Sequence, residues 1–467
     1  VTITDNSDFA IQSGLHVNDL SITSTGAVTD LGSIDIDGTL DVSASGQQVI
    51  LNGNSNDITG AVTLTGAAVT LTNTTATSIG GINASSLDLS SGGAITDTAG
   101  SIILVSGLAT LGNAGAAAIT LGDDASDSVN FGTLNLNGTT VTVTEDSATE
   151  LTGVSASALT LTSGGAITDS GVLDIGGAAS FITTAANGNV ELDQASDVDG
   201  TLSATTNGSG IVSITNLTDA IDLGTISTTA LTVGTVGAIT DTVGAMIAVN
   251  GLATLSNAGS DVITLGDDAT DVTNFNSLNL NGTTVTVTED SSTELSGVSA
   301  SSLVLTSAGA ITDSGVLDIG GAASFTTTAA NGNVELDQAS DVDGVLSVGT
   351  NGSGTTSVTN LTDAINLGTI STTALTIDAS GVLTQSGVST VSGDSSFSAG
   401  ANLINLNLAN DFQGAVSLSN SGGNDVTITT ANALDLGTVG VGQNLTVNAG
   451  GTISDSGIVS VAGTTTL

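Results

Sequence analysis

The sequence predicts an all-β protein, a right-handed parallel β-helix (β-solenoid) built from units of about 72 residues in a 144-residue tandem repeat. Three observations lead to this fold class. The sequence repeats itself along its length. Short apolar–polar–apolar triplets recur about every 8–12 residues. The large side chains that would fill a globular core are almost absent, since the only aromatic residues are seven Phe.

The repeat covers the whole chain. Residues 94–237 and 238–381 align without a gap at an offset of 144, and LNLNGTTVTVTEDS at 134–147 returns unchanged at 278–291. A weaker period of 72 is marked by the motif Gly-Ala-Ile-Thr-Asp. Its Ala falls at Ala94, Ala166, Ala238 and Ala310, with degenerate copies near residues 27, 382 and 452. We therefore expect residues 1–467 to form one continuous rod without linkers.

The triplets predict short strands that stack rather than fold back. Pairs such as Leu317/Ile319, Val334/Leu336 and Leu346/Val348 alternate with polar residues, and Gly, Asn, Asp and Ser separate them. A sandwich or a propeller would need tight hairpin turns, whereas the turns here are Gly-Asn-Asp corners. The usual hand of parallel crossovers predicts right-handed winding. A unit of 72 residues divides into three coils of 24 residues or four of 18, and we favour three-sided coils of about 24.

Composition excludes several classes of function. The chain has no Lys or Arg and a net charge of −45, so it offers no basic surface to nucleic acid. It has no Cys, which rules out disulfides and thiolate chemistry. The window from Ser101 to Leu121 is uncharged, but its counterpart from Ala245 to Leu265 carries Asn250 and Asp261. We therefore expect no membrane span.

The C-terminal unit carries motifs of a known family. These are NDFQGAV at 410–416, NLTV at 444–447 and GTI at 451–453 before DSG at 455–457. With these motifs the chain resembles the repeat region of giant filamentous-haemagglutinin-like bacterial adhesins. The resemblance implies a right-handed parallel β-helix in a secreted or surface-attached protein that serves as a stalk or in adhesion. It supplies no catalytic residues.

Clustered aspartates are candidate calcium ligands, because Ca²⁺ prefers cages of oxygen atoms. They fall before strands in the repeat and in an acidic turn of alternate units: Asp57, Asp197, Asp199, Asp341, Asp343, Asp411, Asp123, Asp124, Asp127, Asp267, Asp268 and Asp271. The alternative is that Asp only caps turns through hydrogen bonds to the backbone. That alternative is favoured because only six of the 45 acidic residues are Glu, which is not a turn residue.

No catalytic or cofactor-binding residue is expected. His16 is the only histidine, so we expect it to be exposed or to cap a turn. The pairs Glu145/Glu150 and Glu289/Glu294 could serve a polysaccharide-acting β-helix enzyme, but they are copied with the repeat, whereas a catalytic site is normally unique.

The sequence thus predicts a structural or adhesive rod segment of a giant extracellular or cell-surface bacterial protein. The alternatives are a calcium-binding solenoid module and the polysaccharide-acting enzyme. No cofactor other than calcium is expected. Leu467 falls in the middle of a predicted coil, so we expect the native chain to continue or copies to stack end to end. A host or neighbouring cell surface is the other expected partner.

Overall fold

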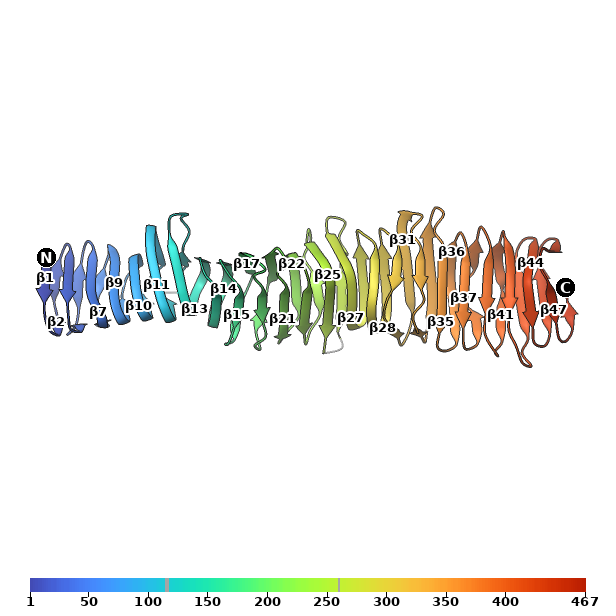
Figure 1. The fold of residues 1–467 in the computed structure, drawn as a ribbon, viewed down its shortest axis with the longest axis horizontal. Helices are drawn as coiled ribbons and strands as arrows, with labels where there is room; N and C mark the ends of the chain where they lie inside the picture. The colour runs from blue at the N-terminus through green and yellow to red at the C-terminus, as the bar shows by residue number, and fades with distance from the viewer. Residues whose placement is uncertain (114–116, 259–260) are drawn as a thin grey trace. The chain divides into compact units, whose positions relative to one another are not determined.

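The computed structural model describes residues 1–113, 117–258 and 261–467, and this part of the chain consists of strands and turns. The predicted all-β class is confirmed. Contacts divide the chain into two units, Val1–Thr235 and Val236–Leu467. In each unit the strands of successive coils lie side by side (Figure 1). The described residues contain no helix of the length and apolarity needed to cross a membrane.

The first unit contains β1 to β23. Their bounds are β1 Thr2–Asp5, β2 Phe9–Ile11, β3 Leu15–Val17, β4 Leu20–Ser24, β5 Val28–Asp30, β6 Ile34–Ile36, β7 Leu40–Leu51, β8 Asp57–Ile58, β9 Ala61–Asn73, β10 Thr77–Ser91, β11 Ile95–Asn113, β12 Ile119–Leu121, β13 Ser128–Glu145, β14 Thr149–Ser163, β15 Ile167–Asp169, β16 Leu173–Ile175, β17 Ala179–Ala186, β18 Val190–Leu192, β19 Asp197–Val198, β20 Thr201–Asn207, β21 Val212–Leu217, β22 Ile221–Thr228 and β23 Leu231–Thr235.

The second unit contains β24 to β48. Their bounds are β24 Ile239–Asp241, β25 Met246–Asn257, β26 Val262–Leu265, β27 Val272–Glu289, β28 Thr293–Ser307, β29 Ile311–Asp313, β30 Leu317–Ile319, β31 Ala323–Ala330, β32 Val334–Leu336, β33 Asp341–Val342, β34 Val345–Asn351, β35 Thr356–Leu361, β36 Ile365–Thr372, β37 Leu375–Ala379, β38 Leu383–Gln385, β39 Ser389–Val391, β40 Ser395–Ser398, β41 Ile404–Phe412, β42 Ala415–Ser419, β43 Val426–Thr430, β44 Leu434–Val441, β45 Leu445–Ala449, β46 Ile453–Asp455, β47 Val459–Val461 and β48 Thr465–Thr466.

Within each unit the described strand pairs are parallel, and each strand pairs with its equivalents one coil before and one coil after, as in a β-solenoid. The sequence separation between Cα partners varies, from the close pair Ala61 and Ser78 to the distant pair Ile102 and Ser128. Long strands such as β10 and β11 carry register shifts where they bend from one side of the coil to the next. A coil therefore has no fixed length.

The tandem repeat winds as seven coils. In the second unit, seven successive partner steps lead from β24 to β38, its counterpart in the next copy of the repeat. The steps pass from Ile239 through Ile263, Val285, Leu303, Ala323, Leu346 and Leu367 to Gln385. One seventh of the repeat gives a mean coil of about 21 residues. The predicted 24-residue coil is therefore wrong, as is the alternative of 18.

The predicted coil lengths assumed that the marker period of 72 residues contains a whole number of coils, and it does not. The marker strand β24 lies on the ladder just described, but the next marker strand, β29, lies on another one, where Ile311 pairs with Thr293 and Val334. The marker returns to the first ladder only at β38. One marker period therefore spans three whole coils and part of a fourth, so successive marker strands lie on different sides of the coil. The coil between Leu303 and Ala323 contains β29 and β30 between its long-side strands, which matches the three-sided prediction.

Alternate residues of each strand fill the core. The members of the ladder from Ile239 to Leu367 are all buried, and so are Phe181, Phe325 and Phe397, which share one repeat position. Side chains of this size fit a narrow interior in which equivalent residues of successive coils stack about 4.8 Å apart. Small aliphatic residues therefore form the core, as the composition predicted.

Candidate functional site

Three carboxylates of the first unit converge at the acidic turn between β12 and β13. Oxygen atoms of Asp97, Asp123 and Asp127 lie within 4.8 Å of one another. Asp97 stands in β11, just after Ile95, whose partner Ile119 begins β12. The coil register therefore places Asp97 beside a turn that comes a full coil later in the sequence.

The turn is held in place by the same side chains. Asp97 Oδ2 accepts hydrogen bonds from the Gly122 amide at 3.0 Å and from Ser101 Oγ at 2.9 Å. Asp127 Oδ1 accepts from the Ser101 amide at 3.0 Å. Gly122 has a φ of 70° and lies so close to β13 that a Cβ atom would come within 2.2 Å of the Thr144 carbonyl oxygen. Only glycine fits there.

One buried oxygen of the cluster stands out. Oδ1 of Asp97 makes no hydrogen bond to any residue that the structure describes. Burial raises the pKa of the Asp97 carboxyl, and the negative charge of Asp127 acts in the same direction, while the hydrogen bonds from Gly122 and Ser101 oppose the rise. A bound cation would satisfy such an oxygen and relieve the repulsion among the three carboxylates.

The second unit carries the same arrangement in the next copy of the repeat. Asp241, Asp267 and Asp271 form the cluster. Asp241 Oδ2 accepts from the Gly266 amide at 2.9 Å, and Asp241 Oδ1 is buried without a partner within 1–113, 117–258 and 261–467. Burial, followed by the charges of Asp271 and Asp267, raises the pKa of Asp241 to about 6. The geometry is therefore a property of the tandem repeat.

Two of the predicted calcium ligands, Asp124 and Asp268, cap turns. Asp124 Oδ1 accepts from the Ser126 amide at 2.9 Å and from Ser126 Oγ at 2.5 Å, and Asp268 makes the same bonds with Thr270. These hydrogen bonds lower the pKa of both carboxyls. For Asp124 and Asp268 the structure shows the turn chemistry that was the alternative to calcium binding.

The remaining predicted ligands do not gather into groups of three in the described part of the chain. Asp197 and Asp341 each have a buried Oδ1 that has no hydrogen-bond partner among the described residues. Burial, together with the charge of Asp199 or Asp343, raises the pKa of each carboxyl. Asp57 accepts from Thr75 Oγ1 at 3.1 Å, and Asp411 accepts from Asn432 Nδ2 at 2.8 Å. These two corner aspartates thus link neighbouring coils through hydrogen bonds.

Five residues of these groups are not among the ligands predicted from the sequence: Asp97, Asp241, His16, Asp35 and Asp37. Asp97 and Asp241 were noted only as parts of the repeat marker. His16 forms a third, exposed group with Asp35 and Asp37, and its Nδ1 lies 2.8 Å from Asp35 Oδ2. The expectation of an exposed histidine is confirmed. Leu15–Val17 pairs with Ile34–Ile36, and this pairing places His16 opposite Asp35. The sequence alone does not predict it.

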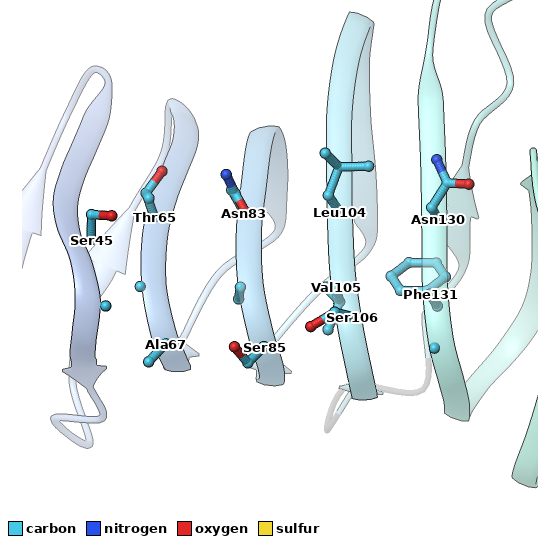
Figure 2. A pocket seen from close by; sticks show the side chains of 14 residues that line it. Ser45, Thr65, Ala67, Asn83, Ser85, Leu104, Val105, Ser106, Asn130 and Phe131 are labelled. Atoms are coloured by element: carbon cyan, nitrogen blue, oxygen red, sulfur yellow. The ribbon is translucent and has the colours of Figure 1, made fainter.

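A shallow cavity of about 520 Å³ lies across five strands of the first unit, β7, β9, β10, β11 and β13. Figure 2 shows Thr65, Asn83, Leu104 and Asn130 in one row along this cavity, and the register pairs them strand by strand. None of its lining residues is charged. In the second unit a smaller cavity lies at the equivalent place, where Asn250, Asn274 and Phe275 repeat the positions of Ser106, Asn130 and Phe131. We refer to the cavity of the first unit as the uncharged groove.

Comparison with known proteins identifies the repeat. A family model described as repeats of unknown function (DUF5649) matches seven consecutive segments, residues 1–65, 66–137, 138–208, 209–279, 282–349, 353–419 and 423–467. Most of these segments are close in length to the unit predicted from the marker motif. No curated protein and no solved structure matches the chain.

Proposed function

The chain belongs to this family of repeats of unknown function (DUF5649), and from that premise we propose that it is a structural and adhesive rod segment of a giant bacterial protein at the cell surface or outside the cell. The observation that carries the proposal is the seven-coil repeat of the second unit. With each repeat the same side chains return to the same side of the solenoid. A chain of this kind adds length and repeated surface without changing its cross-section.

The rod is tested by its length. With a strand spacing of about 4.8 Å and coils of about 21 residues, the 467 residues should extend over about 110 Å. Electron microscopy or small-angle X-ray scattering of the purified chain measures this length directly. Compact particles of half that length would contradict a rod.

We assign adhesion to the uncharged groove. A chain with a net charge of −45 repels acidic polymers, but the groove offers hydroxyl, amide and aliphatic groups without a carboxylate. An uncharged, hydroxyl-rich polymer of a cell surface would suit it. Beads coated with the chain should bind such cells, and Asn83→Asp with Leu104→Asp should reduce the binding. Val304→Asp with Val316→Asp, at two exposed positions outside the groove, adds the same charge and is the matched control. Equal binding by both variants would overturn the assignment.

Calcium binding is the second candidate function, and the two clusters Asp97–Asp123–Asp127 and Asp241–Asp267–Asp271 support it. Millimolar Ca²⁺ should raise the melting temperature more than Mg²⁺ at equal ionic strength, because Ca²⁺ accepts irregular oxygen cages. Asp123→Asn with Asp267→Asn should remove this difference. Asp88→Asn with Asp378→Asn makes the same change of charge at exposed sites outside the clusters and should preserve it. If the two ions had equal effects on the wild-type chain, the screening of carboxylate charges by salt would explain the stabilisation, and specific calcium binding would be contradicted.

A further inference from the structure

Two glutamates lie inside the solenoid. Glu145 at the end of β13 and Glu289 at the end of β27 are each only 1 % exposed. They occupy the same position in successive copies of the tandem repeat. An ionised carboxylate in such a place would need a compensating cation or strong hydrogen bonds, and the chain contains no Lys or Arg.

Both oxygens of each carboxyl have hydrogen-bonding partners nearby. Glu145 Oε1 accepts from the Phe131 amide at 2.9 Å and lies 2.9 Å from Ser147 Oγ, and Oε2 lies 2.6 Å from Thr149 Oγ1. Glu289 makes the same three contacts. Its partners are the Phe275 amide, Ser291 Oγ and Thr293 Oγ1.

A neutral amide makes the same network one marker period earlier. Asn73 Oδ1 accepts from the Ile58 amide at 3.0 Å, and its Nδ2 lies 3.2 Å from Thr77 Oγ1. Thr77 and Ser91 hydroxyls lie 3.0 Å apart, and Ser91 Oγ donates to the Thr75 carbonyl at 2.9 Å. Nδ2 can only donate, and it shares its two protons among Thr77 Oγ1 and the Ile58 and Ala76 carbonyls. Thr77 Oγ1 therefore accepts in its contact with Asn73, and it donates to Ser91, whose own proton goes to the Thr75 carbonyl.

The network around Glu145 fits the same proton order. Ser163 Oγ donates to the Ser147 carbonyl at 2.7 Å, so it can only accept from Thr149 Oγ1, 3.1 Å away. Each hydroxyl has one proton. If Thr149 donates to Ser163, the contact between Thr149 and Glu145 Oε2 needs a proton from the acid. A protonated Oε2 supplies it, and Thr149 then accepts from Glu145 as Thr77 accepts from Asn73.

The surrounding charges favour the same state. Burial is the main cause that raises the pKa of Glu145 and Glu289, and the charges of Asp146 and Asp290 add to it, while the three hydrogen bonds oppose it. The other titratable groups on the elements around Glu145 are Asp97 on β11, Glu150 on β14, and Asp123, Asp124 and Asp127 in the turn before β13. All of them are acids, so none can hold a carboxylate by attraction.

We propose that Glu145 and Glu289 are proton-binding sites, each holding a neutral carboxylic acid inside the solenoid. The protein then loses stability as the medium becomes more basic. Below the ordinary titration range of Glu, the folded and unfolded chains both carry these protons. Above it, only the folded chain holds them, so unfolding releases up to two protons and the folding equilibrium constant falls by up to about 100-fold per pH unit. The loss is complete once the pH exceeds the raised folded pKa.

The test compares two double variants. Glu145→Gln with Glu289→Gln places amides where Asn73 already shows an amide to fit. Glu191→Gln with Glu335→Gln makes the same change at two exposed glutamates. Urea unfolding is measured across neutral pH. The core variant should show a clearly shallower loss of stability with rising pH than the wild type, whereas the surface variant should follow the wild type. Equal slopes for the core variant and the wild type would overturn the proposal.

Infrared spectroscopy gives a second readout that does not depend on unfolding. At neutral pH the wild-type chain should show the carbonyl stretch of a neutral carboxylic acid, shifted in deuterated solvent. The band should persist in the surface variant and vanish or shrink in the core variant. A wild-type spectrum identical to that of the core variant in this region would show that both glutamates are ionised. Single variants at either site keep the comparison available if the double core variant does not fold.

Discussion

The turn around Glu145 and the turn around Leu217 occupy the same position relative to the marker motif, yet one is a polar cluster and the other is apolar. Glu145 faces Thr149, and both side chains are buried. At the equivalent positions Leu217 and Ile221 are buried to the same degree. The second unit repeats the contrast, with Glu289 and Thr293 in one copy and Leu361 and Ile365 in the next.

The comparison shows that this core position holds a polar side chain only together with the side chains that satisfy its hydrogen bonds. A buried hydroxyl or carboxyl costs free energy unless each of its hydrogen-bonding groups finds a partner. Glutamate therefore occurs with a threonine on the next strand, and leucine with isoleucine. Asn73 with Thr77 is a third solution, polar but neutral. Mixed pairs should be unstable.

The largest effect is expected when Leu217 becomes Glu. Ile221 offers no hydroxyl, so the new acid would be buried without the partner that Glu145 has. The free energy of unfolding should fall by about 3–5 kcal/mol at neutral pH. Chemical denaturation measures the loss, and Leu217→Met, which conserves volume, should cost only about 1 kcal/mol. A loss for Leu217→Glu no larger than that of the control would break the comparison.

A smaller loss is expected when Glu145 becomes Leu. The substitution leaves the Phe131 amide without its acceptor and the Thr149 hydroxyl without its contact to Glu145 Oε2, which should cost about 2 kcal/mol. Adding Thr149→Ile builds the pair found at Leu217 and Ile221 and should recover about 1 kcal/mol. A double-mutant cycle measures this coupling. Strictly additive losses would mean that the two side chains do not act as a pair.

The smallest effect is expected at Asp241, a carboxyl of the acidic turn that is less deeply buried than Glu145. Its pKa is raised to about 6 from an ordinary value of 3.8. The stability that its proton contributes is complete below 3.8 and is lost as the pH rises through about 6. Asp241→Asn abolishes this dependence. The free energy of unfolding of the variant should therefore rise relative to that of the wild type as the pH increases between these two values.

At higher pH the advantage of Asp241→Asn should level off at about 1 kcal/mol, because solvent screens a partly exposed carboxyl. Unfolding is measured with a chelator present, so that no divalent cation stabilises the ionised form. An advantage that stays constant from pH 3.8 to about 6 would argue against a raised pKa.

Much of the fold could be predicted from the sequence, because alternation and repetition are local signals. Leu317, Ile319, Val334 and Leu336 are buried as their period-two pattern indicates. The coil length could not be predicted in the same way. Spacing along the chain does not say on which side of the coil a marker lies, and the copies at Ile239 and Ile311 lie on different ladders.

The acidic clusters show the same limit. The aspartates of the turn at 122–127 were recognised, but Asp97 joins them only because Ile95 pairs with Ile119. The burial of Glu145 was within reach of the sequence. It follows Val141 and Val143 at a period of two, on the side of the strand that faces the core. It was instead considered as one half of an acidic pair with Glu150.

The winding of the tandem repeat is the central claim, and one distance tests it. Leu252 and Ser396 are exposed, occupy the same position in successive copies of the repeat and can both be replaced by Cys, because the chain has no other. Spin labels at the two sites should report backbones about 34 Å apart, which is seven strand spacings. A separation of about 29 Å would indicate six of the longer coils first predicted, and one of about 38 Å would indicate eight of the shorter ones. Either result would contradict the seven-coil repeat.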